Sequence, residues 1–293
     1  MNRRDFLQTA TLGAGVFPSL VNGNMLARFV QSQDEDEILC RKKFELAVSK
    51  GWEKLPIGEV IVNIGKTFLG TKYVGHVLEA QGPEHLIVNM RALDCVSFYE
   101  NSLVIARCIK MSKLTFDEYK KQLQLIRYRG GIINGYASRL HYTSDYFYDD
   151  EKKGVWKLMA KEFGGIPYVK KLDFMSTHPE VYWQIRESET VKKQIEAMEK
   201  EISKRTIYYI PKDKVAGISD KIHDGDILGI TTSIEGIDTS HTGICIWQDK
   251  ELHFMHAPLA GGKVEISELV LSEYLAHNKK QTGILIARPL EPA

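Results

Sequence analysis

The chain has 293 residues, with 39 Lys and Arg against 38 Asp and Glu, 43% hydrophobic residues and 26% charged residues. This near-neutral charge disfavours nucleic-acid binding, and because no stretch approaches about 18 apolar residues we expect no stable membrane span. No linker rich in Pro, Gly or Ser divides the sequence, so we expect a single domain over residues 34–293.

The first 33 residues are typical of an export signal and its lead-in. Arg3 and Arg4 form a twin-arginine pair, and a mildly apolar stretch follows over residues 9–21. This arrangement predicts export to the periplasm or another extracytoplasmic space, with cleavage between about residues 23 and 33. The acidic run at 34–37 is expected to be a solvated lead-in to the folded part.

Helices are predicted before strands in the rest of the chain. Apolar residues at helical spacing predict four helices, over residues 38–54, 57–68, 92–110 and 191–202. Alternating apolar residues predict four strands, over residues 227–232, 242–247, 251–257 and 283–288. Helices followed by a run of strands indicate an α+β fold with an antiparallel sheet.

Cys95 is the cysteine with the strongest case for chemistry. It follows Asp94, a plausible helix cap, at the predicted start of a helix. Because a helix N-terminus stabilises an anion, we expect the pKa of this thiol to be lowered. The alternative is that a small apolar side chain simply packs there, which is how we interpret Cys40, Cys108 and Cys245. No disulfide is expected among the four.

A thiolate nucleophile also needs an imidazole to take its proton. His241 opens one predicted strand and His256 closes the next. If the connecting loop has two or four residues, Gly243 lies opposite His256, and His241 lies diagonally beside it on the same face. His253 then points to the other face. A three-residue loop would reverse this parity.

Four segments taken in order resemble the NlpC-type papain-like hydrolases of bacterial cell walls: FLGTKYVGH, LDCVS, GDILGI, and HTGICIW followed by FMHA. The resemblance covers residues 57–110 and 220–290. It implies a papain-like α+β fold with N-terminal helices, the catalytic cysteine on a helix start, and an antiparallel sheet or half-barrel. It further implies three catalytic residues with Tyr73 beside the thiol: Cys95 as nucleophile, His241 as base and His256 as orienter.

A long insertion at about 111–215 separates the cysteine helix from the strands. Its segment GYASRLHYTSDYF is similar to the N-acetylmuramoyl-L-alanine amidase-like branch of that family. This implies a thiol amidase that cleaves the N-acetylmuramoyl to L-alanine amide of muropeptides in cell-wall turnover. The alternatives are a stem-peptide endopeptidase that cuts D-Glu to diamino acid bonds, a non-catalytic wall-binding module, and an acyltransferase.

The insertion is expected to wall the catalytic cleft and to choose the bond that is cut. An arginine and aromatic rings suit carboxylates and sugar rings. The expected substrate-binding residues are Tyr73, Asp94, Ser97, Arg139, His141 and Tyr142.

The sequence predicts neither a metal nor a cofactor. It contains no HExxH, no CxxC pair and no clustered carboxylates, and no Gly-rich loop of the nucleotide-binding kind. The expected partners are peptidoglycan fragments, and we expect a monomer.

Overall fold

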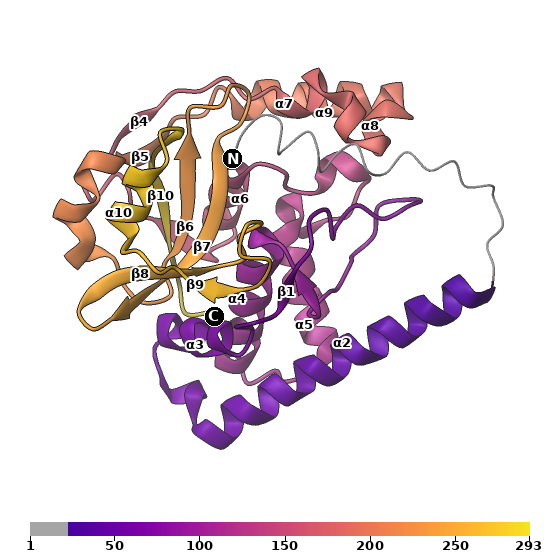
Figure 1. The fold of residues 1–293 in the computed structure, drawn as a ribbon. Coiled ribbons are helices and arrows are strands. Elements are labelled where there is room, and N and C mark those ends of the chain that lie inside the picture. Colours follow the sequence, from indigo (N-terminus) through magenta and orange to yellow (C-terminus); the bar gives the residue numbers. More distant parts are fainter. Residues whose placement is uncertain (1–22) are drawn as a thin grey trace.

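A computed structural model describes the chain from residue 23 to residue 293, and its side chains from residue 34 onward. Helices come first along the chain and a large antiparallel sheet comes last, so the predicted α+β class is confirmed (Figure 1). The twin-arginine pair lies outside the described residues. Among the helices that are described, none has the length and apolar character needed to cross a membrane.

Helix α4 (Cys95–Lys110) is the centre of the helical layer. It packs against α2 (Gly23–Lys50), α3 (Ile57–Lys66), α5 (Phe116–Arg127) and the sheet. Most of its side chains are buried, including polar ones such as Glu100 and Asn101. A helix enclosed in this way has fixed ends, so the group at its N-terminus is held in a defined position.

The acidic run does not form a solvated lead-in, because it lies within α2 and Asp36 is buried. The Asp36 carboxylate accepts hydrogen bonds from the Met90 backbone N–H at 2.9 Å and from Arg91 Nε at 3.1 Å. The long helix α2, seen at the lower edge of Figure 1, is thereby joined to the segment that leads to α4.

The main sheet follows the order β4-β5-β10-β6-β7-β8-β9, and β3 also pairs with β10. All its pairs are antiparallel. The strands are β3 (Trp156–Leu158), β4 (Ile166–Tyr168), β5 (Ile207–Pro211), β6 (Ile227–Thr232), β7 (Thr239–Gln248), β8 (Glu251–His256), β9 (Glu265–Ile266) and β10 (Gln281–Pro289).

The two faces of the sheet bury different cores because side chains alternate along a strand. On one face Ile244 and Met255 pack with α3 and α4. On the other face Cys245 and Phe254 pack with α10 (Leu271–His277). A residue at the end of β7 or β8 is therefore placed near α4 or near α10 by its parity.

The hairpin between β7 and β8 has a two-residue turn at Asp249 and Lys250, whose φ angles are +48° and +70°. Its register pairs Ile244 with Met255 and Ile246 with His253. This is the parity predicted from the sequence. The strand β7 begins three residues earlier than predicted, since a register shift at residue 240 lets Thr239 pair with Thr231.

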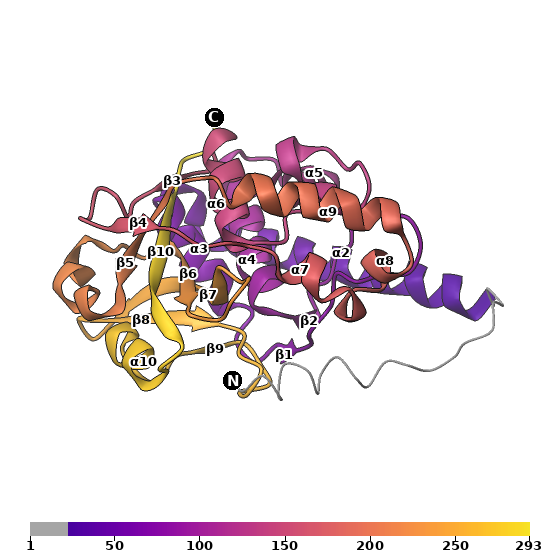
Figure 2. The same cartoon turned by 90° about the horizontal axis from the view of Figure 1, so that it is seen from above.

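The insertion forms part of the sheet as well as a helical layer. It supplies β3, β4 and β5 to the main sheet. It also supplies α6 (Thr143–Lys152), α7 (Phe174–Thr177), α8 (Trp183–Arg186) and α9 (Glu189–Ile202). The last three lie together at one side of the molecule (Figure 2) and enclose their own small core with Tyr142, Leu172 and Ile195.

Candidate active site

Cys95 is the first residue of α4, and Asp94 is its N-cap. The Asp94 carboxylate accepts a hydrogen bond from the Ser97 N–H at 2.7 Å, and the Asp94 N–H donates to Ser97 Oγ at 2.9 Å. This reciprocal arrangement is a capping box. It engages Oδ1 of Asp94 and Oγ of Ser97, the two residues of α4's start that we expect to line the substrate pocket.

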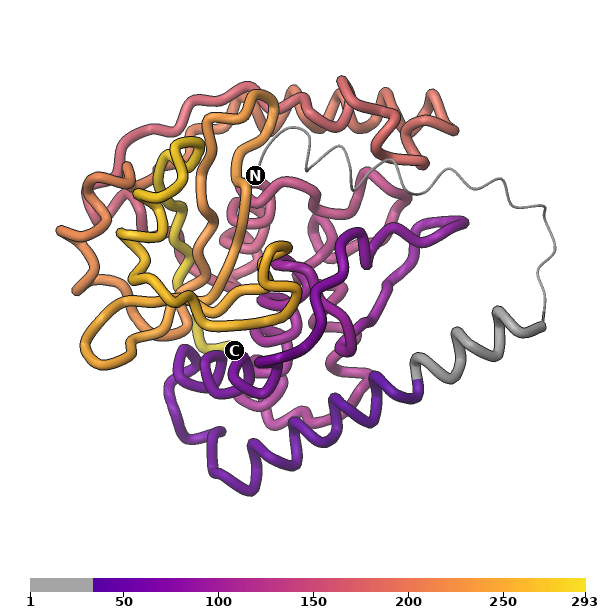
Figure 3. Tube along the Cα trace, in the orientation of Figure 1, coloured from indigo at the N-terminus to yellow at the C-terminus, as the bar shows by residue number. Residues whose placement is uncertain are grey.

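The helix begins at Cys95, three residues later than predicted, because the residues before it form a strand. Strand β2 (Ala92–Leu93) pairs in parallel with β1 (Lys72–Tyr73), which places Tyr73 opposite Leu93. The chain between the two strands leaves β1 and returns to β2, so its two ends lie side by side just before α4 (Figure 3). Burial and then the charge of Cys95 raise the pKa of the Tyr73 hydroxyl.

Helix α4 is joined to strand β7 at Thr242, whose Oγ1 donates a hydrogen bond to the Cys95 carbonyl at 3.0 Å. The preceding residue is His241, and its Nε2 lies 2.7 Å from Nδ1 of His256. The two rings are 5.0 Å apart and nearly perpendicular. The structure therefore brings the two predicted histidines into direct contact.

His253 is separated from this pair. It lies opposite Ile246 on the other face of the hairpin, and its Nδ1 is 2.9 Å from the Ser267 carbonyl. The two-residue turn sets the register that puts His256 on the same face as His241. His253 lies on the opposite face because residues 253 and 256 differ by an odd number along one strand.

The electrostatics of the thiol differ from the sequence prediction. Burial, and then the neighbouring Asp94 carboxylate, raise the pKa of Cys95 to about 11, against opposing hydrogen bonds that include Thr242. We had expected a lowered pKa from the helix N-terminus, and that expectation was wrong because desolvation of the thiolate and the Asp94 charge outweigh the helix dipole.

Both histidines are held neutral. Burial lowers the pKa of His241 to about 4, and burial followed by the charge of His241 lowers the pKa of His256 to about 3. At neutral pH the site therefore holds a thiol and two uncharged imidazoles. A neutral imidazole can accept a proton from a thiol during a reaction, so this chemistry does not require a thiolate–imidazolium pair in the resting protein.

Two side chains that the sequence did not single out complete this neighbourhood. Glu265 on β9 pairs across the sheet with His256, and its Oε1 lies 4.0 Å from His256 Nε2. The ring of Tyr274 on α10 lies 5.7 Å from the ring of His256 and 4.8 Å from that of Phe254. Both come from elements too short to give a periodic pattern, so no signal in the sequence pointed to them.

The insertion residues expected to bind substrate are already bonded within the chain. Arg139 is 4% exposed and donates to Glu79 at 2.8 Å, while the Tyr142 hydroxyl donates to Glu199 at 2.6 Å. His141 Nε2 lies 3.0 Å from the Tyr136 carbonyl. In this structure these three side chains support the insertion and are not free to grip a carboxylate or a sugar ring.

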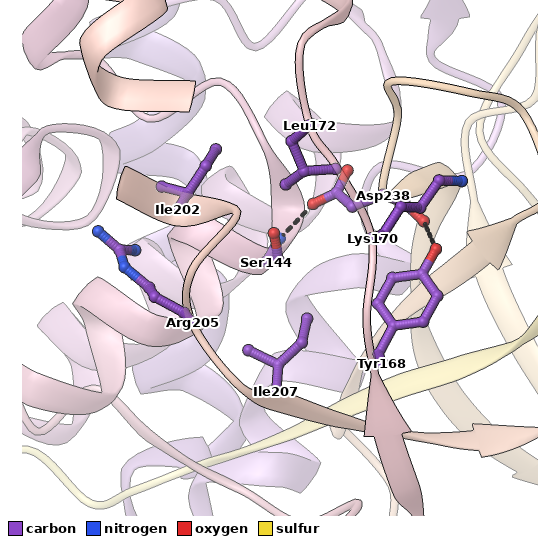
Figure 4. Close-up of a pocket in the computed structure, with 8 residues that line it drawn as sticks. All are labelled: Ser144, Tyr168, Lys170, Leu172, Ile202, Arg205, Ile207 and Asp238. Carbon is purple, nitrogen blue, oxygen red and sulfur yellow. Dashed lines mark hydrogen bonds between the residues drawn. The ribbon is translucent and has the colours of Figure 1, made fainter. Parts of the chain in front are cut away.

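The first turn of α6, in the insertion, is bonded to the residue that precedes β7, the strand that carries His241. Figure 4 shows a small cavity at this junction, where Asp238 accepts a hydrogen bond from the Ser144 N–H at 2.6 Å and the Tyr168 hydroxyl donates to the Asp238 carbonyl at 2.6 Å. None of the residues that line it is a candidate catalytic residue. The junction holds Asp238, the residue directly before β7 and three residues before His241.

Comparison with known proteins places the chain in a family. Residues 63–284 match the family model described as AmiA-like, N-acetylmuramoyl-L-alanine amidase-like. The chain belongs to this amidase-like family. No curated protein matches the chain.

Solved structures agree with this assignment. An N-acetylmuramoyl-L-alanine amidase from Bacteroides uniformis is 34% identical, with a TM-score of 0.76 over 80% of this chain and 98% of its own. A Legionella pneumophila protein of the DUF1460 family has a TM-score of 0.69 over 89% of this chain and 96% of its own. At 19% identity, the second comparison supports the fold alone.

Proposed function

We propose that this protein is a papain-like cysteine amidase that cleaves the N-acetylmuramoyl to L-alanine amide of muropeptides, without a metal or cofactor. The observation that carries the proposal is that Cys95 stands at a capped helix start whose first carbonyl is bonded by Thr242, the residue that follows His241, and that His241 contacts His256. Membership of the amidase-like family supports the choice of an amide in peptidoglycan. The twin-arginine pair supports work outside the cytoplasm.

In the proposed mechanism Cys95 is the nucleophile and His241 is the general base. His241 Nε2 is engaged by His256, so its Nδ1 takes the thiol proton as Sγ attacks the amide carbonyl. The oxyanion is met by the backbone N–H of Cys95, which lies at the positive end of α4. The imidazolium then protonates the leaving L-alanine nitrogen, and water hydrolyses the muramoyl thioester to a carboxylate.

Product analysis with defined muropeptides tests the bond assignment. Incubation of a muramoyl-tripeptide should release a free tripeptide that begins with L-alanine and a muramic acid with a free lactyl carboxylate, both identified by mass spectrometry. Release of L-alanyl-D-glutamate from the glycan-free stem would instead identify an endopeptidase. Binding of fragments without any product would identify a wall-binding module.

Substitutions test the residue assignments. Cys95→Ala should abolish hydrolysis in a folded protein, because loss of a nucleophile costs many orders of magnitude in rate. His241→Ala should be nearly as damaging, and His256→Ala milder. His253→Ala is the matched control, since its ring faces the other side of the same hairpin, and it should leave kcat within about twofold. Hydrolysis by a folded Cys95→Ala protein would exclude the thiol mechanism.

A further inference from the structure

Glu265 has a fixed place beside the histidine pair, although it is partly open to solvent. Its backbone pairs with that of His256, and its Oε1 lies 4.0 Å from His256 Nε2. Gly261 makes room for it, because a Cβ at residue 261 would lie 2.7 Å and 2.8 Å from the two carboxylate oxygens. The carboxylate is therefore folded back against the loop before β9 and lies near the outer nitrogen of His256.

The positions of the protons on the two imidazole rings decide whether His241 can act as a base. Each neutral imidazole carries one N–H, and the 2.7 Å contact between His241 Nε2 and His256 Nδ1 needs one proton between them. If His241 holds that proton, its Nδ1 is bare and can accept the thiol proton. If His256 holds it, the proton of His241 lies on Nδ1, and no base is available to Cys95.

We propose that Glu265 is a positioning residue that selects the competent tautomer through His256. This inference rests on the catalytic roles proposed above. A carboxylate near Nε2 favours a proton on that nitrogen, which leaves His256 Nδ1 bare as an acceptor for the His241 Nε2–H. A distance of 4.0 Å is closed by a small side-chain rotation or by one bridging water.

The same carboxylate has a second effect during catalysis. When His241 takes the thiol proton it becomes positively charged, and a negative charge beyond His256 favours that imidazolium. The other titratable groups facing His256 are His241 on β7 and Tyr274 on α10, and both are uncharged at neutral pH because burial lowers the pKa of His241 and raises that of Tyr274. Glu265 is thus the carboxylate that contacts His256 in the described part of the chain.

Three substitutions test the proposal on the full chain, assayed with a muramoyl-tripeptide. Glu265→Ala should lower kcat by about 5- to 20-fold with KM within about twofold, the range of one charge-assisted hydrogen bond at a partly exposed position. Glu265→Gln retains an acceptor oxygen without the charge and should fall between the wild type and the alanine variant. Gly261→Ala keeps the charge but displaces the carboxylate, and it should lower kcat in the same direction.

The decisive comparison uses a His256→Asn background. An asparagine offers an acceptor oxygen to the His241 Nε2–H and has no tautomers to select, so Glu265→Ala should then change kcat by less than about twofold. An equal loss in both backgrounds would overturn the proposal, because it would mean that Glu265 acts on substrate or on stability. Thermal unfolding of each variant checks that the proteins are folded.

Ring ¹⁵N chemical shifts of the unliganded protein give a readout that needs no activity. Wild-type His256 should carry its proton on Nε2, and Glu265→Ala should move a measurable share of it to Nδ1. Unchanged tautomers would overturn the role of Glu265 even if the amidase mechanism holds. Conversely, a muropeptide assay that contradicts the amidase function leaves the tautomer measurement intact, so the two failures are distinguishable.

Discussion

Asp94 has two effects: its charge raises the pKa of the Cys95 thiol, and its side-chain oxygen caps α4. The substitution Asp94→Asn removes the charge and keeps a capping oxygen. Asparagine caps a helix as well as aspartate does, so unfolding free energy should change by no more than about 0.5 kcal/mol. Removing the carboxylate removes the second largest cause of the raised thiol pKa of about 11. We expect that pKa to fall by about one unit, which is about 1.4 kcal/mol.

Alkylation of Cys95 by iodoacetamide measures this shift. At a pH below the thiol pKa, a fall of one unit gives about ten times more thiolate, but each thiolate is about three times less nucleophilic. The net rate should therefore rise about threefold at pH 8 to 9. Peptide mass spectrometry isolates Cys95, because the other three thiols are fully buried.

Ser97→Ala is the matched control, because it removes the reciprocal capping bond and keeps the charge. It should lower stability by about 1 kcal/mol and leave the alkylation rate within about twofold. If folded Asp94→Asn protein were alkylated no faster than the wild type, the carboxylate would not be a cause of the raised thiol pKa.

Two further predictions concern buried ionisable side chains. The pKa values of His241 (about 4) and His256 (about 3) are lowered in the folded protein, so the unfolded chain binds more protons below pH 6.5. The unfolding free energy should therefore fall from pH 6.5 towards pH 4, by up to about 1.4 kcal/mol per pH unit for each ring. Urea unfolding at several pH values checks this, and in His256→Asn the unfolding free energy should depend less steeply on pH. The Arg127–Glu100 pair is buried at 2.7 Å, so Arg127→Met should cost about 3–5 kcal/mol in the same assay, and a loss below about 1 kcal/mol would contradict an uncompensated buried Glu100.

The order of helices and strands could be predicted because the apolar residues that face the core recur at helical or alternating spacing along the sequence. The strand over residues 227–232 was placed to the residue, and the hairpin register followed from assuming a short turn. The start of α4 was placed three residues early, since Ala92 and Leu93 look helical by composition. Only their pairing with residues 72–73, across a loop of 18 residues, makes them a strand.

Those properties of the candidate site that depend on burial by distant parts of the chain could not be predicted from the sequence. The sign of the Cys95 pKa shift depends on how much water the folded chain removes, which no local pattern reveals. Arg139 and Tyr142 have the residue types of a substrate-binding loop. Their carboxylate partners, Glu79 and Glu199, are about 60 residues away along the chain, so their structural role became visible only in three dimensions.

The contact between α2 and the segment before Cys95 limits how far the N-terminus can be trimmed. Asp36 bonds to Met90 and Arg91, which lead directly into β2 and the capped start of α4. Removal of the chain before residue 34 would leave this anchor in place. Removal of Asp36 itself would free Arg91 Nε and the Met90 N–H together, which would loosen the residues that lead into β2 and the start of α4, far along the chain from the truncation.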